Sequence, residues 1–343
     1  MNPGTLLHAR DIVYTGYIAN DPDCIIICGP TCSGKSKLAL FLADSLGGEI
    51  VSCDSMQIYR GMNIGTAKPT EAEMTLVPHH LIDIVDPWEE YSVFKYREAA
   101  LTAIQDIISR GRIPVVCGGT GLYVNSLLDN RQFAAGEEDS TVFDSYKNEA
   151  ETAEELYNAK RFDELYAMLE KYDPEAAASF HRNNSVRVLR ALKLFFITGK
   201  RKNEREAESV AKPSEIRFST FCLMPDRKAL YADIDKRVDL MRGQGLLEEA
   251  VRIYKISRER AAGLGIAPEA VKNMTAFAAI GYKELLPFTG FPETAVDESL
   301  LPPEKRPYNV DTAFREIKLN TRHYAKRQIT WFKKTPGTVF IDV

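Results

Sequence analysis

The chain has 343 residues, of which 45% are hydrophobic, and carries 44 Lys and Arg against 48 Asp and Glu. This composition excludes a disordered or collagen-like chain, provides enough apolar residues for a packed core, and at this length predicts two or three lobes. The net charge of −4 excludes a uniformly basic nucleic-acid-binding protein, so any surface for nucleic acid must be a local patch.

Membrane and disulfide-rich classes are also disfavoured. No segment approaches the roughly 18 consecutive apolar residues of a membrane helix, and the N-terminus lacks the pattern of a secretory signal. We therefore expect a cytoplasmic protein with no membrane partner. The six cysteines are scattered without a C-x-x-C pair, which disfavours a zinc site or a disulfide framework and predicts core or near-core thiols.

Residues 1–23 form an N-terminal extension in which we recognise no pattern. From residue 24 the sequence predicts a strand, a loop, a helix and a second strand. The apolar run CIIIC at 24–28 is the first strand, the helix ends at a Gly-Gly pair, and EIVSCD at 49–54 is the second strand. This is the pattern of a βαβ unit.

A second unit follows, with a helix over 96–109 and the strand IPVVC that runs into GGTGLY. These units predict an α/β fold, a P-loop NTPase-like parallel sheet core with helices on both faces. The segment 130–210 is polar, helical in pattern and without strand signals, and predicts an all-α insertion domain. The core would then consist of 24–129 and of 211–343, which begins with strand IRFSTFCLM and ends in long helices.

The segment GPTCSGKS follows the first predicted strand and matches the phosphate-binding pattern G-x-x-x-x-G-K-[ST]. In this pattern backbone N–H groups face a phosphate, while the lysine and the hydroxyl serve its charge and its metal. A strand before and a helix after support the match over a fortuitous glycine-rich turn. The predicted phosphate-binding residues are Gly29, Pro30, Thr31, Cys32, Ser33, Gly34, Lys35 and Ser36.

One acidic residue stands where it can share this site. Asp54 follows the second strand, and the carboxyl ends of parallel strands share one edge of a sheet, so Asp54 should lie one or two strand spacings from the P-loop. The alternative is that Asp54 only caps the next turn, which is equally common for an Asp after a strand. The strand IPVVC ends in GGTG without the carboxylate that an ATPase or GTPase would place there.

Basic and aromatic residues suggest an RNA surface but admit simpler explanations. Arg187, Arg190 and Lys193 recur at helical spacing and could follow a phosphate backbone, or form an ordinary solvated face. In the C-terminal segment TRHYAKRQITWFKK, cations alternate with Tyr324 and Trp331, which we expect to anchor the core. The adjacent histidines of PHHLID would point to opposite sides of an extended segment, so local structure is a better explanation than metal binding.

The order and approximate spacing of several motifs resemble those of bacterial tRNA dimethylallyltransferases, the isopentenyl transferases that act on adenosine 37. The similarity extends over about residues 24–332, and its segments are GPTCSGKS, CDSMQIYRGMNIGTAKP, PHHLIDIVDPWEEYSVFKYREAA, IPVVCGGTGLY, RVLRALKLFFITGK, DKRVDLM, IGYKE and TRHYAKRQITWF. P-loops occur in many families, whereas the combination of the Asp-Ser-x-Gln and Ile-Gly-Thr-Ala-Lys-Pro segments is specific to few.

The resemblance implies that the P-loop holds the diphosphate of dimethylallyl diphosphate and that the prenyl group passes to N6 of the adenine. Asp54 would accept the amino proton as the new bond forms. Thr31, Lys35 and Arg237 would stabilise the leaving diphosphate, and Ser36 would bind it through Mg²⁺. Charge alone does not distinguish Arg237 from its neighbouring cations, since an arginine on such a helix is usually solvated.

The resemblance also implies contacts with the anticodon stem-loop of tRNA, whose target base must leave its stack to react. The implied tRNA-binding residues are Asp54, Ser55, Met56, Gln57, Thr120, Arg187 and Arg190. The substrates would be tRNAs that read codons beginning with U, and we expect a monomer.

Three positions depart from the family pattern. Cys32 replaces the usual Ala, Asn63 replaces Asp and could remove a supporting contact, and Met56 replaces a frequent Arg. Two alternative functions remain at this point. One is a P-loop kinase or ATPase that holds ATP, and the other is a non-catalytic RNA-binding protein.

Overall fold

The computed structural model describes residues 2–129, 145–208, 214–289 and 308–343, together with residues 297, 301 and 305. The chain forms two compact units: one comprises Met1–Leu128 and Ser214–Val343, and the other comprises Asp129–Pro213. Among the described residues, no helix is long and apolar enough to cross a membrane.

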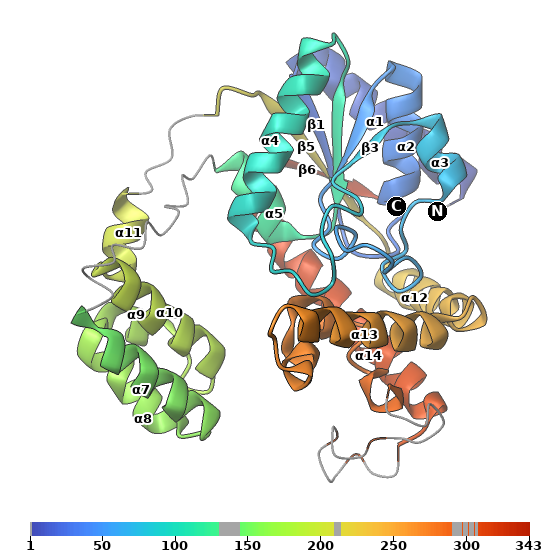
Figure 1. Cartoon of the computed structure of the whole chain (residues 1–343). Coiled ribbons are helices and arrows are strands. Elements are labelled where there is room, and N and C mark those ends of the chain that lie inside the picture. Colours follow the sequence, from blue (N-terminus) through green and yellow to red (C-terminus); the bar gives the residue numbers. More distant parts are fainter. Residues whose placement is uncertain are drawn as a thin grey trace. The chain divides into compact units, whose positions relative to one another are not determined.

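The larger unit is built on a parallel sheet of six strands in the order β3-β2-β4-β1-β5-β6 (Figure 1). The strands are β1 (Cys24–Cys28), β2 (Glu49–Ser52), β3 (His79–His80), β4 (Pro114–Gly118), β5 (Phe218–Met224) and β6 (Thr338–Asp342). Strand β4 pairs with β1 on one side and with β2 on the other. The predicted α/β fold with a parallel sheet is confirmed.

Helices cover both faces of the sheet because the strand side chains alternate between two apolar cores. On one face, Ile26 and Val116 pack with α4 (Val93–Ser109) and α5 (Gly121–Leu128). On the other face, Ile25, Ile27 and Val115 pack with α1 (Pro3–Asn20) and α2 (Lys35–Leu46). These strands are therefore buried on both sides, as their unbroken apolar runs predict.

Four elements of this unit were not expected. The N-terminal extension contains α1, which begins after an Asn2 cap whose side chain accepts a hydrogen bond from the Thr5 amide. Ala9 and Val13 of α1 are buried against the sheet, so this helix is part of the core. The short β3 and the C-terminal β6 complete the two edges of the sheet, and α3 (Glu71–Leu76) precedes β3.

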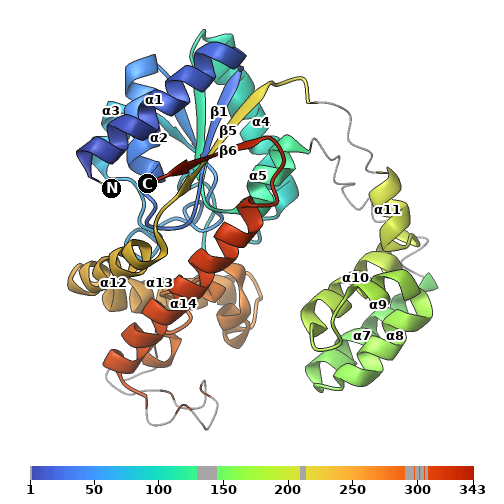
Figure 2. The same ribbon diagram turned by 180° about the vertical axis from the view of Figure 1, so that it is seen from behind.

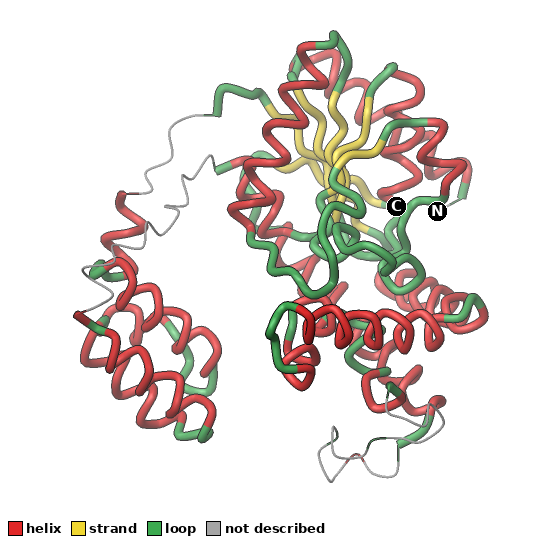
Figure 3. The backbone as a smooth tube through the Cα atoms, in the orientation of Figure 1, coloured by secondary structure: helices red, strands yellow, loops and turns green. Residues whose placement is uncertain are grey.

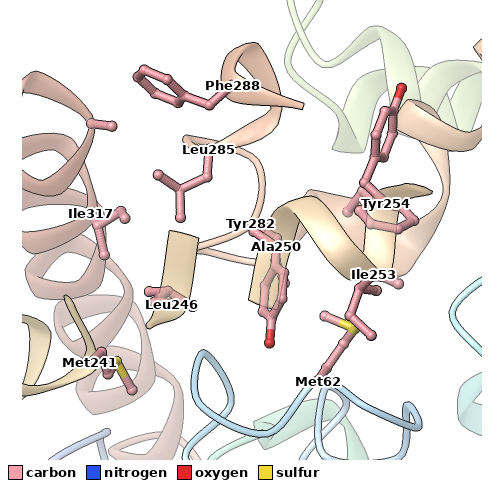
Figure 4. Close-up of a cluster of buried hydrophobic side chains, with 14 of the residues drawn as sticks. Met62, Met241, Leu246, Ala250, Ile253, Tyr254, Tyr282, Leu285, Phe288 and Ile317 are labelled. Atoms are coloured by element: carbon pink, nitrogen blue, oxygen red, sulfur yellow. The ribbon is translucent and has the colours of Figure 1, made fainter. Parts of the chain in front are cut away.

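The described part of the larger unit between β5 and β6 is mainly helical. Its helices are α12 (Arg227–Gly243), α13 (Leu246–Gly263), the 3-10 segments Pro268–Asn273, Thr275–Ala278 and Leu286–Phe288, and α14 (Val310–Phe332). Figure 4 shows their shared core, in which Leu246, Tyr282 and Ile317 are joined by Met62 from the loop after β2. This core attaches the helices to a loop that follows a strand.

The smaller unit has its own core. It contains α7 (Lys147–Asn158), α8 (Phe162–Tyr172), α9 (Pro174–Ser179), α10 (Ser185–Thr198) and α11 (Lys202–Glu208). Leu165 and Leu169 of α8 pack with Leu192 and Phe196 of α10. The described residues of this unit are therefore helical, as the sequence predicts for 130–210, while 130–144 and 209–210 lie outside the described residues.

A buried carboxylate links the start of β2 to its neighbours. Glu49 is only 3% exposed, and its two carboxylate oxygens accept hydrogen bonds from Arg110 at 2.5 and 2.8 Å. His80 Nε2 lies 2.7 Å from Oε2, and Arg112 lies 3.3 Å from Oε1. These hydrogen bonds, that from Arg110 above all, lower the pKa of Glu49 to about 2.

We expect Glu49→Gln to lower the free energy of unfolding by about 2 kcal/mol at neutral pH. This is less than the full pKa shift would correspond to, because the Arg110 side chain is partly exposed and solvent screens its charge. A lowered folded-state pKa stabilises the fold above the unfolded value and ceases to do so as the pH falls toward 2. Denaturant unfolding between pH 7 and pH 3 should therefore show the difference from the wild type shrinking below about pH 4.5. Glu259→Gln, at an exposed position, is the control. A difference that is constant with pH would contradict this assignment.

Candidate active site

The loop between β1 and α2 folds as a phosphate-binding loop. Helix α2 begins at Lys35, directly after Gly34, whose φ of 89° lies in the left-handed region that favours glycine. The first amides of a helix have no partner within it, so this loop offers N–H donors to an anion. Lys35 Nζ donates to the Pro30 carbonyl at 3.3 Å, which holds the ammonium group over the loop.

A cavity of about 450 Å³ lies in the larger unit, at the end of the sheet where loops gather in Figure 3. Eight of the predicted site residues line it: Thr31, Lys35 and Ser36 of the P-loop, Asp54, Ser55, Met56 and Gln57 after β2, and Arg237 of α12. The other P-loop residues complete the turn. The predicted juxtaposition of the P-loop with Asp54 is thus present, with β4 lying between their strands.

The cavity is also lined by Arg327 of α14, one of the cations of the C-terminal segment, which was not among the predicted site residues. Its guanidinium lies 5.7 Å from the ring centroid of Tyr324, which also lines the cavity. Burial raises the pKa of Tyr324 to about 12, and the Asp54 charge adds to the rise, so its hydroxyl stays protonated. Tyr324 was expected to anchor the core, and the structure shows that it also lines the cavity.

The remaining wall of the cavity is largely apolar. Ile234, Val238 and Met241 come from α12, Leu246 from the start of α13, and Ile317 from α14. A hydrocarbon group can be buried on this wall while a charged group faces the P-loop. The cavity can therefore hold a ligand with one anionic and one apolar end.

Arg237 is the cation of α12 that reaches the P-loop. Its Nη1 lies 3.4 Å from Thr31 Oγ1 and 3.6 Å from Cys32 Sγ. The neighbouring Lys236 is exposed and lies 3.8 Å from Asp233, while Arg227 lies over the ring of Tyr231. The structure thus distinguishes Arg237 from its neighbours, which charge alone could not do.

Asp54 combines the two roles that the sequence left open. Its Oδ1 accepts a hydrogen bond from the Met56 amide at 2.9 Å, which caps the turn after β2. Its Oδ2 has no hydrogen-bond partner within the described part of the chain, and the residue lines the cavity. One oxygen therefore fixes the carboxylate while the other can accept a proton.

The residues after Asp54 are held by side-chain hydrogen bonds. The Ser55 amide donates to Thr120 Oγ1 at 3.0 Å, so Thr120 supports this loop from beside the cavity. Gln57 Oε1 accepts from Ser52 Oγ at 3.0 Å, and its Nε2 lies within 3.3 Å of the carbonyls of Thr66 and Ala67. Gln57, an expected tRNA-binding residue, therefore ties together two parts of the connection between β2 and α3.

Glu249 of α13 holds the loop that contains the family segment from Ile64 to Pro69. Its carboxylate accepts hydrogen bonds from the amides of Asn63, Ile64 and Gly65 at 2.9 to 3.1 Å and from the Tyr282 hydroxyl at 2.6 Å. Glu249 is 4% exposed, so these donors compensate a buried charge. Sequence reasoning missed it because the backbone amides that it binds lie more than 180 residues away.

We expect Glu249→Gln to destabilise the larger unit by about 2 to 4 kcal/mol, because one amide oxygen cannot accept all the bonds that two carboxylate oxygens accept. The measurement is denaturant unfolding, together with limited tryptic proteolysis after Arg60, which is exposed and precedes this loop. Glu248→Gln, one residue earlier on α13, is the matched control. Equal stability and equal cleavage in the two variants would show that Glu249 does not hold the loop.

The predicted RNA-facing arginines lie in the smaller unit. Arg187 and Arg190 are both exposed on α10 and share one side of the helix. Lys193, expected to continue this basic face, forms an ion pair with Glu154 at 2.5 Å. The structure therefore keeps two of the three cations available on the surface of the helical unit.

Metal-binding groups are few. His79 Nδ1 lies 2.7 Å from the Val77 carbonyl, and His80 pairs with Glu49, so the two histidines serve local structure. Burial lowers the pKa of His79, which favours its neutral form. Across the described residues, no group of three His, Cys, Asp or Glu side chains could hold a metal ion. The hydroxyl of Ser36, which lines the cavity, remains the candidate ligand for a metal that arrives with a phosphate.

Comparisons with known proteins agree on one family. The family model described as IPP transferase matches residues 57–335, and that described as isopentenyl transferase matches 22–83. The chain is 38% identical to the tRNA dimethylallyltransferases of Acetivibrio thermocellus, over 318 residues, and of Halalkalibacterium halodurans, over 319 residues. These alignments cover 93% of this chain and 91% and 90% of the relatives.

Two solved structures are similar as well. The full-length tRNA isopentenylpyrophosphate transferase of Bacillus halodurans has a TM-score of 0.60 at 35% identity, with 93% of this chain and 89% of that chain covered. A eukaryotic dimethylallyltransferase described as acting on tRNA has a TM-score of 0.71 at 30% identity, with 93% and 73% covered. Sequence and structure therefore indicate the same relatives.

Proposed function

Because this chain belongs to the tRNA dimethylallyltransferase family, we propose that it transfers the dimethylallyl group of dimethylallyl diphosphate to N6 of adenosine 37 in tRNA. The substrates would be tRNAs that read codons beginning with U, and the protein would act as a cytoplasmic monomer. The observation that carries the proposal is the single cavity in which the P-loop and Arg237 share space with Asp54.

The P-loop side of the cavity suits a leaving diphosphate. As the allylic C–O bond breaks, negative charge grows on the diphosphate oxygens, and preorganised donors there stabilise the transition state. Lys35 and Arg237 supply cationic donors, and the Thr31 hydroxyl lies 3.4 Å from Arg237. The apolar wall from α12 and α14 would hold the hydrocarbon group and keep water from the allylic cation.

Asp54 suits the role of proton acceptor. The lone pair of an adenine amino group is conjugated with the ring, so the nitrogen becomes nucleophilic only as its proton is withdrawn. In the proposed step the new C–N bond forms, the C–O bond breaks, diphosphate leaves, and the N6 proton passes to Asp54 Oδ2. The Met56 amide holds the other oxygen in place during this step.

Magnesium fits the P-loop by the chemistry of its donors. Mg²⁺ prefers oxygen ligands and keeps several waters, so the Ser36 hydroxyl together with diphosphate oxygens would be a suitable set. When bound, the ion would neutralise part of the charge of the diphosphate. Lys35, next to Ser36 in the chain, would supply the remaining positive charge.

Recognition of tRNA would involve both units. The base would enter beside Ser55, Met56 and Thr120, with Gln57 shaping the loop, and single-stranded RNA loops can present a base in this unstacked form. The exposed Arg187 and Arg190 would contact phosphates of the anticodon stem-loop. These contacts would bring the base and the diphosphate to opposite sides of the cavity.

The proposed activity is tested by incubating the protein with Mg²⁺, unmodified tRNA and labelled dimethylallyl diphosphate, followed by nucleoside analysis. We expect label in N6-(dimethylallyl)adenosine, and its loss when Mg²⁺ is chelated or when adenosine 37 is replaced by guanosine. A parallel reaction contains labelled ATP. Consumption of ATP without prenyl transfer would instead support a P-loop kinase or ATPase, and tRNA binding without either reaction would support a non-catalytic protein.

Asp54→Asn separates the two roles of this residue, because the Asn side-chain oxygen can still accept from the Met56 amide but cannot take a proton. We expect kcat to fall about 10³-fold, while the Kd for tRNA changes less than about threefold. Asp54→Ala, which also loses the turn contact, is the comparison. If Asp54→Asn kept near-normal kcat while Asp54→Ala lost it, the residue would only cap the turn.

A further inference from the structure

Gln328 of α14 joins the two sides of the cavity. The residue is 6% exposed and lines the cavity between the P-loop and the loop after β4. Its Oε1 accepts a hydrogen bond from the Thr31 amide at 2.9 Å, and its Nε2 donates to the Gly119 carbonyl at 2.8 Å. One buried side chain therefore holds two loops that lie more than 200 residues away in sequence.

Further hydrogen bonds link Gly119 to the loop that carries Asp54, the proposed proton acceptor. The next residue, Thr120, donates its amide to the Cys53 carbonyl at 3.3 Å and accepts from the Ser55 amide at 3.0 Å. Cys53 and Ser55 are the two neighbours of Asp54 in the chain. Gln328 is thus connected to the diphosphate side through Thr31 and to the Asp54 loop through Gly119 and Thr120.

The helix that carries Gln328 is itself firmly packed. Ala325 and Ile329 of α14 pack with Leu230 and Ile234 of α12, and Phe332 is buried in the core beneath α4. Figure 2 shows α14 passing α5 before the chain enters β6. A Cβ atom at Gly119 would lie only 2.3 Å from Gln328 Nε2, so the loop approaches the side chain as closely as a glycine allows.

We propose that Gln328 is a positioning residue that sets the geometry between the leaving diphosphate and Asp54. This inference rests on the proposed function. The site needs an acceptor at one end and a donor at the other, which a side-chain amide supplies and a carboxylate or a thioether does not. The hydrogen bond from the Thr31 amide to Gln328 fixes the backbone of Thr31, whose hydroxyl lies 3.4 Å from Arg237 Nη1.

The positioning role predicts a loss in turnover rather than in binding. Displacement requires the reacting atoms in near-attack geometry, and a small misplacement of either loop lowers the rate. Gln328→Met keeps the length of the side chain and loses both hydrogen bonds. We expect its kcat to fall about 10- to 100-fold, with the KM values for both substrates changed less than about threefold. Gln105→Met, at an exposed position of α4, is the control.

Gln328→Glu adds a second readout. Its ionised carboxylate keeps an acceptor for Thr31 but lacks the donor to Gly119, whereas the protonated form regains that donor. The kcat of Gln328→Glu relative to the wild type should therefore rise as the pH falls. A ratio that does not change with pH, or a kcat of Gln328→Met equal to the wild type, would overturn the positioning role.

Hydrogen–deuterium exchange tests the tether without substrate. In Gln328→Met, the segments 29–34 and 118–121 should exchange about tenfold faster than in the wild type and in Gln105→Met, while β5 should not change. Unchanged exchange in both segments would overturn the inference. If the wild type transfers no prenyl group but exchange accelerates as expected, the proposed function fails and the tether stands.

Discussion

The position of β4 between β1 and β2 is the constraint on which this site depends. Neighbouring strands lie about 4.8 Å apart, so the loops after β1 and β2 begin roughly 10 Å from each other. Residues of both loops line the same cavity, so a ligand that lies between them can contact the P-loop and Asp54 at once. Strand β4 ends in Gly118, where a Cβ atom would lie 1.9 Å from the Cys53 carbonyl, so the loop that carries Asp54 can cross directly over it.

Three side chains, two of them buried and that of Gln57 partly buried, hold the loops around this gap. Glu249 binds the amides of 63–65, Gln57 binds the carbonyls of Thr66 and Ala67, and Gln328 bridges Thr31 and Gly119. Each satisfies backbone groups that a loop would otherwise present to water. The same bonds limit the movement of the cavity wall, which is the condition for a preorganised electrostatic site.

Local sequence patterns predicted the strands, loop and helix whose signals lie within a few neighbouring residues. The apolar runs of β1 and β4, the P-loop and the helix after it follow from periodicity and glycine placement, and the position of Asp54 follows from the rule that parallel strands end at one edge. The short β3 and the edge strand β6 carry little periodic signal and are stabilised by pairing with distant strands. Glu249 and Gln328 were not predicted because a lone Glu or Gln on a helix is normally solvated. Only tertiary contacts distinguish them.

The insertion of residues 129–213 between the two halves of the larger unit has a consequence for synthesis of the chain. A ribosome would synthesise Lys35 and Asp54 long before Arg237, and Arg237 long before Gln328. Until β5 is made, β1 lacks that neighbour, and until α12 and α14 are made, the P-loop lacks the helices that close the cavity. Folding of this unit must therefore wait for contacts of high sequence separation, which are slow to form. A nascent chain that ended within the smaller unit would therefore expose the phosphate-binding loop and the unpaired edge of β1. Such a chain would be a substrate for chaperones and would not yet be an enzyme.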